Sequence, residues 1–291
     1  MPELPEVETV RLGLNELLPG RIFDKVEADT KKSFPNARSD VETFLIGSSV
    51  VAIKRRAKVL IIELSSDYSL VTHLKMTGQL VFVSNETRFG AGHPNDSLVG
   101  DLPDKSTRVT FTFSDGTRLF FNDQRKFGWM RLMPTVDVPN IDFMRKVGPE
   151  PLAVDFTPDV FIERLRRRKN STIKATLLDQ SVLAGVGNIY ADESLWGAKI
   201  HPASLVRVVS NQKLHTLFTE LQYVLNLAIQ KGGSSDKNYV NAEGKKGSYL
   251  TFARVFRREG LACPRCGTTI VKLRVAGRGT HICPHCQSLQ G

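Results

Sequence analysis

The sequence predicts a multidomain α+β protein, with a β-rich N-terminal domain, a helical middle region and a small metal-binding tail. Strand-type alternation dominates from about residue 50 to residue 132, and helical periodicity takes over beyond residue 153. All four cysteines of the 291-residue chain lie in its last 29 residues. We therefore expect four segments, which are 1–133, a linker at 134–152, 153–250 and 251–291.

A helix is predicted near the N-terminus, because apolar residues recur at helical spacing at Val7, Val10, Leu14 and Leu17. Pro19-Gly20 ends this pattern.

The β-rich part begins with a buried-strand run, VLIIEL at 59–64. Asp115-Gly116 separates two alternating stretches and predicts a hairpin, since both residue types tolerate positive φ. The segment 84–105 is rich in Gly, Asn, Asp and Pro and predicts a long surface loop. The segment 134–152 contains four prolines, which is typical of a linker.

Helix signals follow the linker. Thr157 is a candidate N-cap with Pro158 at the first helical position. Ser210 is a candidate N-cap for a longer helix that Gly232-Gly233 ends. The apolar stripe of that helix contains Leu214, Leu217, Leu221, Val224 and Ala228.

Composition and charge narrow the class of protein. The 41% of hydrophobic residues and 24% of charged residues are ordinary for a globular chain, and no apolar run approaches the roughly 18 residues of a membrane span. The N-terminal MPELPEVETV has neither a basic nor an apolar signal region, so we expect the cytoplasm and no membrane partner. Forty Lys and Arg against thirty Asp and Glu give a net charge of +10, which fits either a solubilising surface or a polyanionic partner such as nucleic acid.

The cysteine pattern predicts one structural Zn²⁺. Cys263 and Cys266 form one Cys-x-x-Cys pair, and after sixteen residues Cys283 and Cys286 form a second. Two such pairs bring four thiolates to one tetrahedral point, whereas disulfides are disfavoured in a cytosolic protein. His281 and His285 are alternative ligands that fit less well. The intervening sequence alternates like a β-hairpin with 276–279 at its tip, where Arg278 is well placed to meet a phosphate.

The N-terminus is a candidate nucleophile. Met1 is normally removed when a small residue follows, and removal would expose the secondary amine of Pro2. An α-amino group titrates near pH ~7.7–8.0, so a fraction is neutral and can attack an electrophilic sugar carbon. Glu3 lies one residue away as a candidate acid. Taken alone, Pro-Glu at a terminus is more often helix-start chemistry.

Several segments together resemble the formamidopyrimidine-DNA glycosylase family, in the family's order from end to end. These segments are MPELPEVETV, RRAK at 55–58, HLKMTG at 73–78, DQRKFG at 123–128, LDQSVLAGVGNIYADESLW at 178–196 and the four-cysteine finger.

The resemblance implies an N-terminal β-sandwich with a flanking helix, a helix–two-turn–helix DNA-binding domain with a lesion-covering loop, and a C-terminal β-hairpin zinc finger. It also implies a bifunctional base-excision-repair enzyme, a DNA-formamidopyrimidine glycosylase and DNA-(apurinic or apyrimidinic site) lyase. Such an enzyme removes 8-oxoguanine and formamidopyrimidines from double-stranded DNA through a proline Schiff base and β,δ-elimination. We expect a monomer associated with the bacterial nucleoid.

The family's catalytic roles fall on four residues. Pro2 matches the nucleophile, and Glu3 matches the acid that assists base departure. Lys58 matches the lysine assigned to proton transfer in β-elimination. Arg278 matches the finger arginine that contacts phosphates flanking the lesion and is assigned to δ-elimination.

The DNA contacts are assigned in the same way. Met76, Arg125 and Phe127 match the three side chains that fill the gap left by a flipped nucleotide. The remaining expected DNA contacts are His73, Lys169, Lys174 and Asn188. Asn188 also follows Gly185-Val186-Gly187 at a predicted helix N-terminus, where free N–H groups suit a phosphate.

Three departures from the family pattern stand out. Ser106 occupies the place of a DNA-contacting histidine, the loop at 84–105 is longer than usual, and 234–250 matches the lesion-covering loop only loosely. Two alternatives remain open at this point. One is an endonuclease VIII-like glycosylase for oxidised pyrimidines, which Leu4 in place of glycine disfavours. The other is a non-catalytic zinc-finger DNA-binding protein, which an intact Pro2, Glu3 and Lys58 disfavours.

Overall fold

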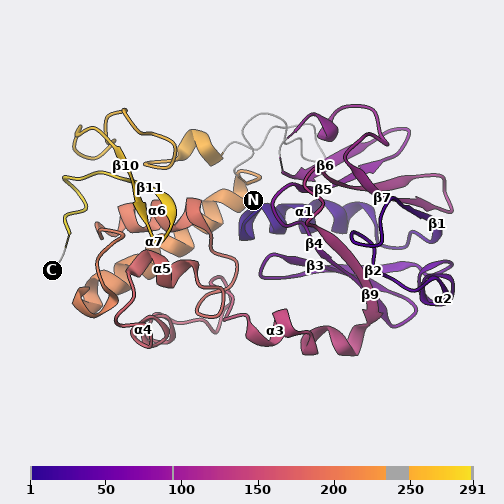
Figure 1. Cartoon of the computed structure of the whole chain (residues 1–291), viewed down its shortest axis with the longest axis horizontal. Coiled ribbons are helices and arrows are strands. Elements are labelled where there is room, and N and C mark those ends of the chain that lie inside the picture. Colours follow the sequence, from indigo (N-terminus) through magenta and orange to yellow (C-terminus); the bar gives the residue numbers. More distant parts are fainter. Residues whose placement is uncertain (1, 94, 234–248, 290–291) are drawn as a thin grey trace. The chain divides into compact units, whose positions relative to one another are not determined.

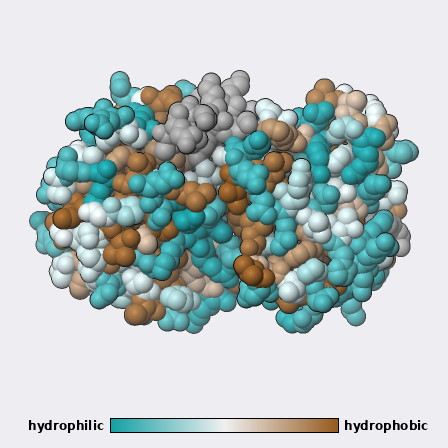
Figure 2. Space-filling model, turned by 180° about the vertical axis from the view of Figure 1, so that it is seen from behind, coloured by the Kyte–Doolittle hydropathy of each residue, from teal (hydrophilic) through white to brown (hydrophobic). Residues whose placement is uncertain are grey.

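The chain forms two compact units, seen in a computed structural model that describes residues 2–93, 95–233 and 249–289. One unit comprises Met1–Arg145 with Ile229–Ser248, and the other comprises Lys146–Ala228 with Tyr249–Gly291 (Figure 1). Hydrophilic residues predominate on the face drawn in Figure 2, as expected for a chain with a net charge of +10. No helix within the described ranges is both long and apolar enough to cross a membrane.

The first unit is a β-sandwich. A five-stranded antiparallel sheet has the order β1-β7-β8-β5-β6, and a four-stranded sheet has the order β2-β3-β4-β9. The strands are β1 Phe23–Ala28, β2 Val50–Arg56, β3 Val59–Leu64, β4 Tyr68–His73, β5 Gly78–Val83, β6 Arg88–Gly92, β7 Thr107–Phe113, β8 Arg118–Asp123 and β9 Trp129–Pro134. Phe111 and Phe121 of one sheet share a core with Ile62 and Leu70 of the other. The predicted sandwich is confirmed.

Helix α1, Leu4–Leu17, flanks the sandwich as the periodicity predicts. Its apolar side is buried in the same core, and it packs against β2 and β6. The contact with β6 is close, because a Cβ added to Gly13 would lie 2.2 Å from the Phe89 ring. The helix ends before Pro19, and Gly20 has a φ of +84°. Helices α2 Arg38–Asp40 and η1 Val41–Leu45, like β1, lay outside the sequence-based expectations.

The predicted long loop at 84–105 was wrong in part. It contains strand β6 and the short helix η2 Asp96–Leu98, and Phe89 and Ala91 are buried. Glycine is common here for packing, since a Cβ on Gly92, whose φ is +125°, would lie 2.5 Å from the Gly78 carbonyl oxygen. The glycines that made this segment look like a loop are therefore needed where two strands lie close together.

The hairpin between β7 and β8 is confirmed, with one difference in its turn. Gly116 donates its N–H to the Phe113 carbonyl, 2.9 Å away, and has a φ of +81°. Asp115 does not have a positive φ, so the turn needs only one residue of that kind. Asp115 instead accepts a hydrogen bond from the Thr117 N–H through its side chain.

The second unit is built from helices and one hairpin. Its elements are α4 Pro158–Arg166, α5 Ile173–Leu178, α6 Asn188–Gly197, η4 Val206–Val208, α7 Asn211–Gln230, η5 Tyr249–Phe252, β10 Val271–Val275 and β11 Arg278–Ile282. The Thr157 hydroxyl accepts from the Val160 N–H at 3.4 Å, and the Ser210 hydroxyl accepts from the Lys213 N–H at 3.3 Å. Both predicted N-caps are confirmed.

The segment predicted as a linker, 134–152, also has structure of its own. It contains η3 Thr135–Asn140 and α3 Asp142–Lys146. Val138 is buried against Val59 and Val71 of the four-stranded sheet. The first part of the expected linker is therefore ordered, and the boundary between the two units falls inside the segment, between Arg145 and Lys146. Of the expected lesion-covering loop, residues 234–248 lie outside the described residues.

Candidate functional site

The first two residues of the candidate nucleophile region are buried at the start of α1. Glu3 is the N-cap of the helix, and its backbone N–H donates to the Glu6 carboxylate at 2.8 Å. The side chains of Pro2 and Glu3 are both buried. The N-terminal end of a helix carries partial positive charge, which favours a carboxylate at the position of Glu3. Helix α1 therefore fixes an acid directly beside the predicted nucleophile.

Lys58 is buried in a tight turn between β2 and β3. Ala57, its neighbour in that turn, has a φ of +52°. Lys58 has only 6% of its surface exposed, which is unusual for a lysine. Burial of this kind fits a functional lysine better than a solvated strand edge.

His73 ends β4 and pairs across the sheet with Val59, next to Lys58. Burial, together with the charges of Lys75 and Lys58, lowers the pKa of His73 to about 3. Its Nδ1 accepts a hydrogen bond from the Lys75 N–H at 3.0 Å, so the ring carries its proton on Nε2. His73 is thus a neutral donor and not a cation.

Met76, Arg125 and Phe127 lie together at the surface of the first unit. Arg125 Nη1 is 2.9 Å from Met76 Sδ, and the Arg125 guanidinium lies 5.0 Å from the centre of the Phe127 ring. Met76 is 41% exposed and Phe127 46% exposed, although both are apolar. Two separate segments of the chain therefore present one exposed cluster, which we call the wedge.

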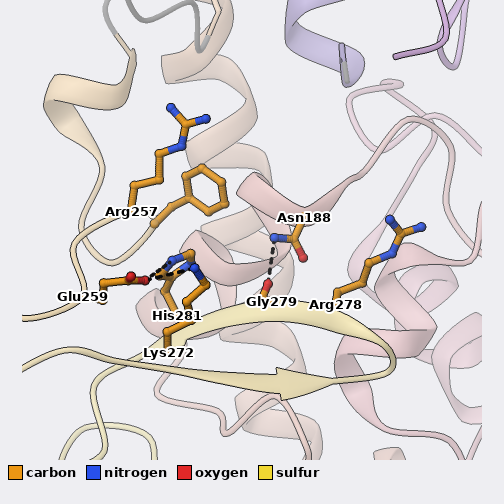
Figure 3. Close-up of a pocket in the computed structure, with 8 residues that line it drawn as sticks. Asn188, Arg257, Glu259, Lys272, Arg278, Gly279 and His281 are labelled. Atoms are coloured by element: carbon orange, nitrogen blue, oxygen red, sulfur yellow. Dashed lines mark hydrogen bonds and ion pairs between the residues drawn. The ribbon is translucent and has the colours of Figure 1, made fainter. Parts of the chain in front are cut away.

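Asn188 and Arg278 meet beside a pocket in the second unit. Helix α6 begins at Asn188, whose Nδ2 donates to the Gly279 carbonyl of β11 at 3.0 Å. Figure 3 shows the Asn188 side chain reaching the hairpin next to Arg278. The pocket has a volume of about 520 Å³, and Arg257 and Lys272 also line it. Glu259 also lines the pocket and pairs with Lys272 Nζ at 3.4 Å, so the guanidinium groups of Arg257 and Arg278 are the donors that suit a phosphate.

The hairpin differs in one detail from its prediction. The two residues of its turn are Ala276 and Gly277, with φ of +50° and +72°. Arg278 is the first residue of β11 and pairs with Val275. It is therefore held by the hairpin ladder and directly follows the two-residue turn.

Lys174 is buried inside the second unit, whereas a phosphate contact must lie at the surface. Its side chain has no exposed surface, and its Nζ donates to Asp192 Oδ1 at 2.6 Å and to Thr280 Oγ1 at 2.7 Å. The expectation that Lys174 grips DNA was wrong, because this lysine satisfies a buried acid. Lys169, by contrast, is exposed.

Asp192 also fixes the finger hairpin, a role that sequence reasoning missed. Its Oδ2 accepts from the His281 N–H at 2.9 Å and lies 3.3 Å from His281 Nδ1. His281 Nε2 is 3.3 Å from Glu259. Since both ring nitrogens of His281 face carboxylates, this histidine is not the alternative metal ligand.

The four cysteines form a site that fits zinc. Their sulfur atoms all lie within 4.8 Å of one another. A tetrahedral ion with Zn–S bonds of ~2.3 Å would hold its ligands roughly 3.8 Å apart. The indole Nε1 of Trp196 is buried and has no hydrogen-bond partner of normal geometry in the described ranges, yet it packs in one cluster with Cys263 and Cys283. The Cys263 sulfur interacts with this N–H, and a thiolate bound to a cation is a suitable acceptor for it, so the surroundings fit the metal.

Family comparisons cover nearly the whole chain. Residues 1–130 match the formamidopyrimidine-DNA glycosylase N-terminal domain, and residues 147–239 match the H2TH domain of the same family. Residues 260–289 match the zinc finger found in FPG and IleRS. The chain belongs to the formamidopyrimidine-DNA glycosylase family. It is a DNA glycosylase of base excision repair with one structural zinc.

Relatives of this glycosylase match over their full length. The formamidopyrimidine-DNA glycosylase of Pediococcus pentosaceus is 40% identical over 291 residues, which is 100% of each chain. That of Enterococcus faecalis is 40% identical over 296 residues, covering 100% of this chain and 99% of the relative. A crystal structure of a Lactococcus lactis FPG mutant in complex with Fapy-dG DNA has a TM-score of 0.86 at 36% identity, covering 99% of this chain and 100% of that chain.

Proposed function

We propose that this glycosylase excises oxidised purines, chiefly 8-oxoguanine and formamidopyrimidines, from duplex DNA and then cleaves the abasic strand by β,δ-elimination. The observation that carries the proposal is Pro2 and Glu3 side by side at the start of α1. The solved relatives support it, since one Lactococcus lactis structure holds DNA with an abasic site and one MutM structure holds DNA with carbocyclic 8-oxo-G.

Pro2 is the proposed nucleophile. With Met1 removed, the lone pair of the Pro2 nitrogen attacks C1′ of the damaged nucleotide, and the bond from C1′ to the base breaks. Loss of the proton from the nitrogen and opening of the sugar ring leave an iminium, which splits one difficult displacement into easier steps. A secondary amine suits this role because its iminium has no N–H proton to lose, so it stays cationic and keeps withdrawing electrons from the sugar.

Glu3 and Lys58 are the proposed proton-transfer groups. Glu3 assists departure of the base by meeting the charge that develops as the bond to C1′ breaks. Lys58 takes part in the proton transfer of β-elimination, in which a proton leaves C2′ and the C3′–O bond breaks. Its burial limits contact with bulk water, which reduces proton leakage from the site.

Arg278, Asn188, Lys169 and His73 are the proposed phosphate contacts. Arg278 offers a planar set of donors to the phosphates that flank the lesion, and we assign it to δ-elimination as well. Asn188 adds the N–H groups of the first turn of α6. His73 donates without charge, because its pKa is about 3.

The wedge of Met76, Arg125 and Phe127 is proposed to enter the stack when the lesion is flipped out. Apolar surface that is exposed in the free protein becomes buried between bases, which offsets part of the cost of unstacking. Its basic member can also face the phosphates or the opposite base.

The proposal also assigns work to the segments. Catalysis belongs to 1–133, DNA binding to 153–250 and the finger to 251–291, with 134–152 between them. A DNA-repair enzyme of this family acts on the chromosome, so we place it in the cytoplasm at the bacterial nucleoid.

Borohydride trapping over a panel of lesions tests this function. The enzyme should form a covalent adduct with duplexes that contain 8-oxoguanine, a formamidopyrimidine or an abasic site, and much less with oxidised pyrimidines. Preference for oxidised pyrimidines would favour the endonuclease VIII-like alternative. Binding without any adduct would favour a non-catalytic DNA-binding protein.

A further inference from the structure

Asp123 is a buried carboxylate at the end of β8, immediately before the loop that carries Arg125 and Phe127. It has no exposed surface. Its Oδ2 accepts from the backbone N–H groups of Phe127 at 2.8 Å and Gly128 at 2.6 Å. Its Oδ1 accepts from the Arg125 N–H at 3.2 Å and from the Thr77 hydroxyl. One carboxylate thus collects four donors.

These donors come from both segments of the wedge. Arg125 and Phe127 are wedge residues, and Asp123 binds their own N–H groups. Thr77 directly follows Met76, the third wedge residue, and its hydroxyl both donates to Asp123 and accepts from the Arg125 N–H at 3.1 Å. Asp123 is therefore the point at which the two segments are tied together.

The loop has little room to adopt another shape around this carboxylate. Lys126 has a φ of +56°, so the loop turns sharply between Arg125 and Phe127. A Cβ added to Gly128 would lie 2.6 Å from the Phe121 ring and 3.1 Å from Asp123 Oδ2. Asp123 binds the backbone N–H groups of the loop from the protein interior, and the Phe127 side chain is exposed.

We propose that Asp123 is a positioning residue that sets the direction of the wedge, holding Arg125 and Phe127 through their backbone and Met76 through Thr77. The inference rests on the proposed role of the wedge in filling the stack. Pre-ordering matters here because a wedge that must first be ordered loses part of its binding free energy to that ordering. An acid is required, since four donors converge and only an ionised carboxylate accepts on both oxygens without offering a donor.

Asp123→Asn is the variant that tests this requirement. An amide has one accepting oxygen and one NH₂ group, so either orientation places a donor against two donors of the loop. Asp104→Asn is a matched control in the same unit. Asp104 also accepts from a backbone N–H and a hydroxyl of a loop, those of Ser106 at 2.7 Å each, but within the described residues its hydrogen bonds do not reach the wedge.

The measurement is the fluorescence of a 2-aminopurine next to an 8-oxoguanine in duplex DNA, which rises when a wedge unstacks it. Asp123→Asn should slow this rise and single-turnover excision together, by at least about tenfold, while cleavage of a single-stranded abasic substrate changes less than about twofold. Asp104→Asn should change neither rate. Wild-type insertion by Asp123→Asn, or equal slowing by Asp104→Asn, would overturn the proposal.

Phe127→Ala separates the proposed role of the wedge in insertion from the proposed role of Asp123 in positioning the wedge. In the Phe127→Ala background, Asp123→Asn should slow insertion by less than it does in the wild type, because the part of its effect that passes through Phe127 is already lost. Full additivity would mean that Asp123 supports the fold and not the wedge. If Phe127→Ala alone left insertion unchanged, the wedge role itself would fail. Should Asp123→Asn not fold, Thr77→Val keeps the carboxylate and should slow insertion in the same direction, and an unchanged rate would count against the proposal.

Discussion

Lys174 and Asp192 form an ion pair of 2.6 Å in which neither side chain has any exposed surface. The pair joins α5 to α6, and the same lysine and acid bind the finger hairpin at Thr280 and His281. Lys174, which follows a run of basic residues in the sequence, therefore stabilises the interior of the second unit. The finger that carries Arg278 is fixed to the helices by this buried network.

Replacing Lys174 should affect stability and not the electrostatics of DNA binding. Lys174→Ala leaves the Asp192 carboxylate buried without its cation, which costs about 3–5 kcal/mol of unfolding free energy in such cases. Denaturant unfolding measures this loss. Under conditions in which Lys174→Ala remains folded, its slope of log affinity against log salt for undamaged duplex should equal that of the wild type. Lys169→Ala, which removes an exposed charge, should make this slope shallower by about one charge. A slope reduced by Lys174→Ala and not by Lys169→Ala would reverse the two assignments.

Removal of zinc should unfold the finger, and Trp196 should control how fast zinc leaves. Trp196→Phe keeps an aromatic ring at the place that Arg254 and Arg265 cover at 4.8 and 3.8 Å, but removes the indole N–H that interacts with the Cys263 sulfur. Loss of an outer hydrogen bond to a metal ligand typically weakens metal affinity ~10–100-fold. A colorimetric chelator should therefore take zinc from Trp196→Phe faster than from wild type. Trp129→Phe is the control, and equal release rates in all three proteins would contradict the prediction.

His73 should make the first unit less stable in acid. Its pKa is about 3 in the folded chain, against 6.5 for an ordinary histidine. The unfolded chain therefore binds a proton between these values and the folded chain does not, so stability falls as the pH drops from about 6.5 towards 3. Each pKa unit corresponds to about 1.4 kcal/mol. His73→Gln should show a weaker dependence of unfolding free energy on pH in this window, and an identical dependence would mean that His73 is not neutral when folded.

Periodicity and turn chemistry predicted the elements that depend on local sequence. The helix at 4–17, the hairpin at Asp115-Gly116 and the caps at Thr157 and Ser210 are all confirmed. Strand β6 was missed because its glycines are needed for contacts with distant residues, and composition alone cannot distinguish this from a loop.

The site was predictable only where a side chain has one plausible task. The cysteine spacing determined the metal site, and the resemblance brought Met76, Arg125 and Phe127 together although they lie far apart in the sequence. Lys174 was assigned wrongly because its partners, Asp192 and Thr280, are brought to it only by folding. Asp123 was overlooked because its four donors are backbone and hydroxyl groups that no motif records.

Glu3→Gln should separate the two chemical steps. Glutamine keeps the size of the side chain but cannot donate an acidic proton, so excision of 8-oxoguanine should fall by at least the ~10²–10⁴-fold that is typical of general acid catalysis. Cleavage at a preformed abasic site should be largely retained, because the sugar already presents an aldehyde and no base must leave. Single-turnover rates on both substrates measure this. An equal fall in both would assign Glu3 to imine formation or to the structure of the site.

The amine of Pro2 is the proposed nucleophile, and peptide mapping of the borohydride-trapped adduct tests this assignment most directly. The enzyme is trapped on an 8-oxoguanine duplex, digested and sequenced by mass spectrometry, with a protein that verifiably retains Met1 as the control. We predict that the DNA remnant is attached to the N-terminal peptide at Pro2, and that the control forms no adduct because its Pro2 nitrogen is an amide. Attachment at Lys58, or trapping of the Met1-retaining protein, would contradict the account.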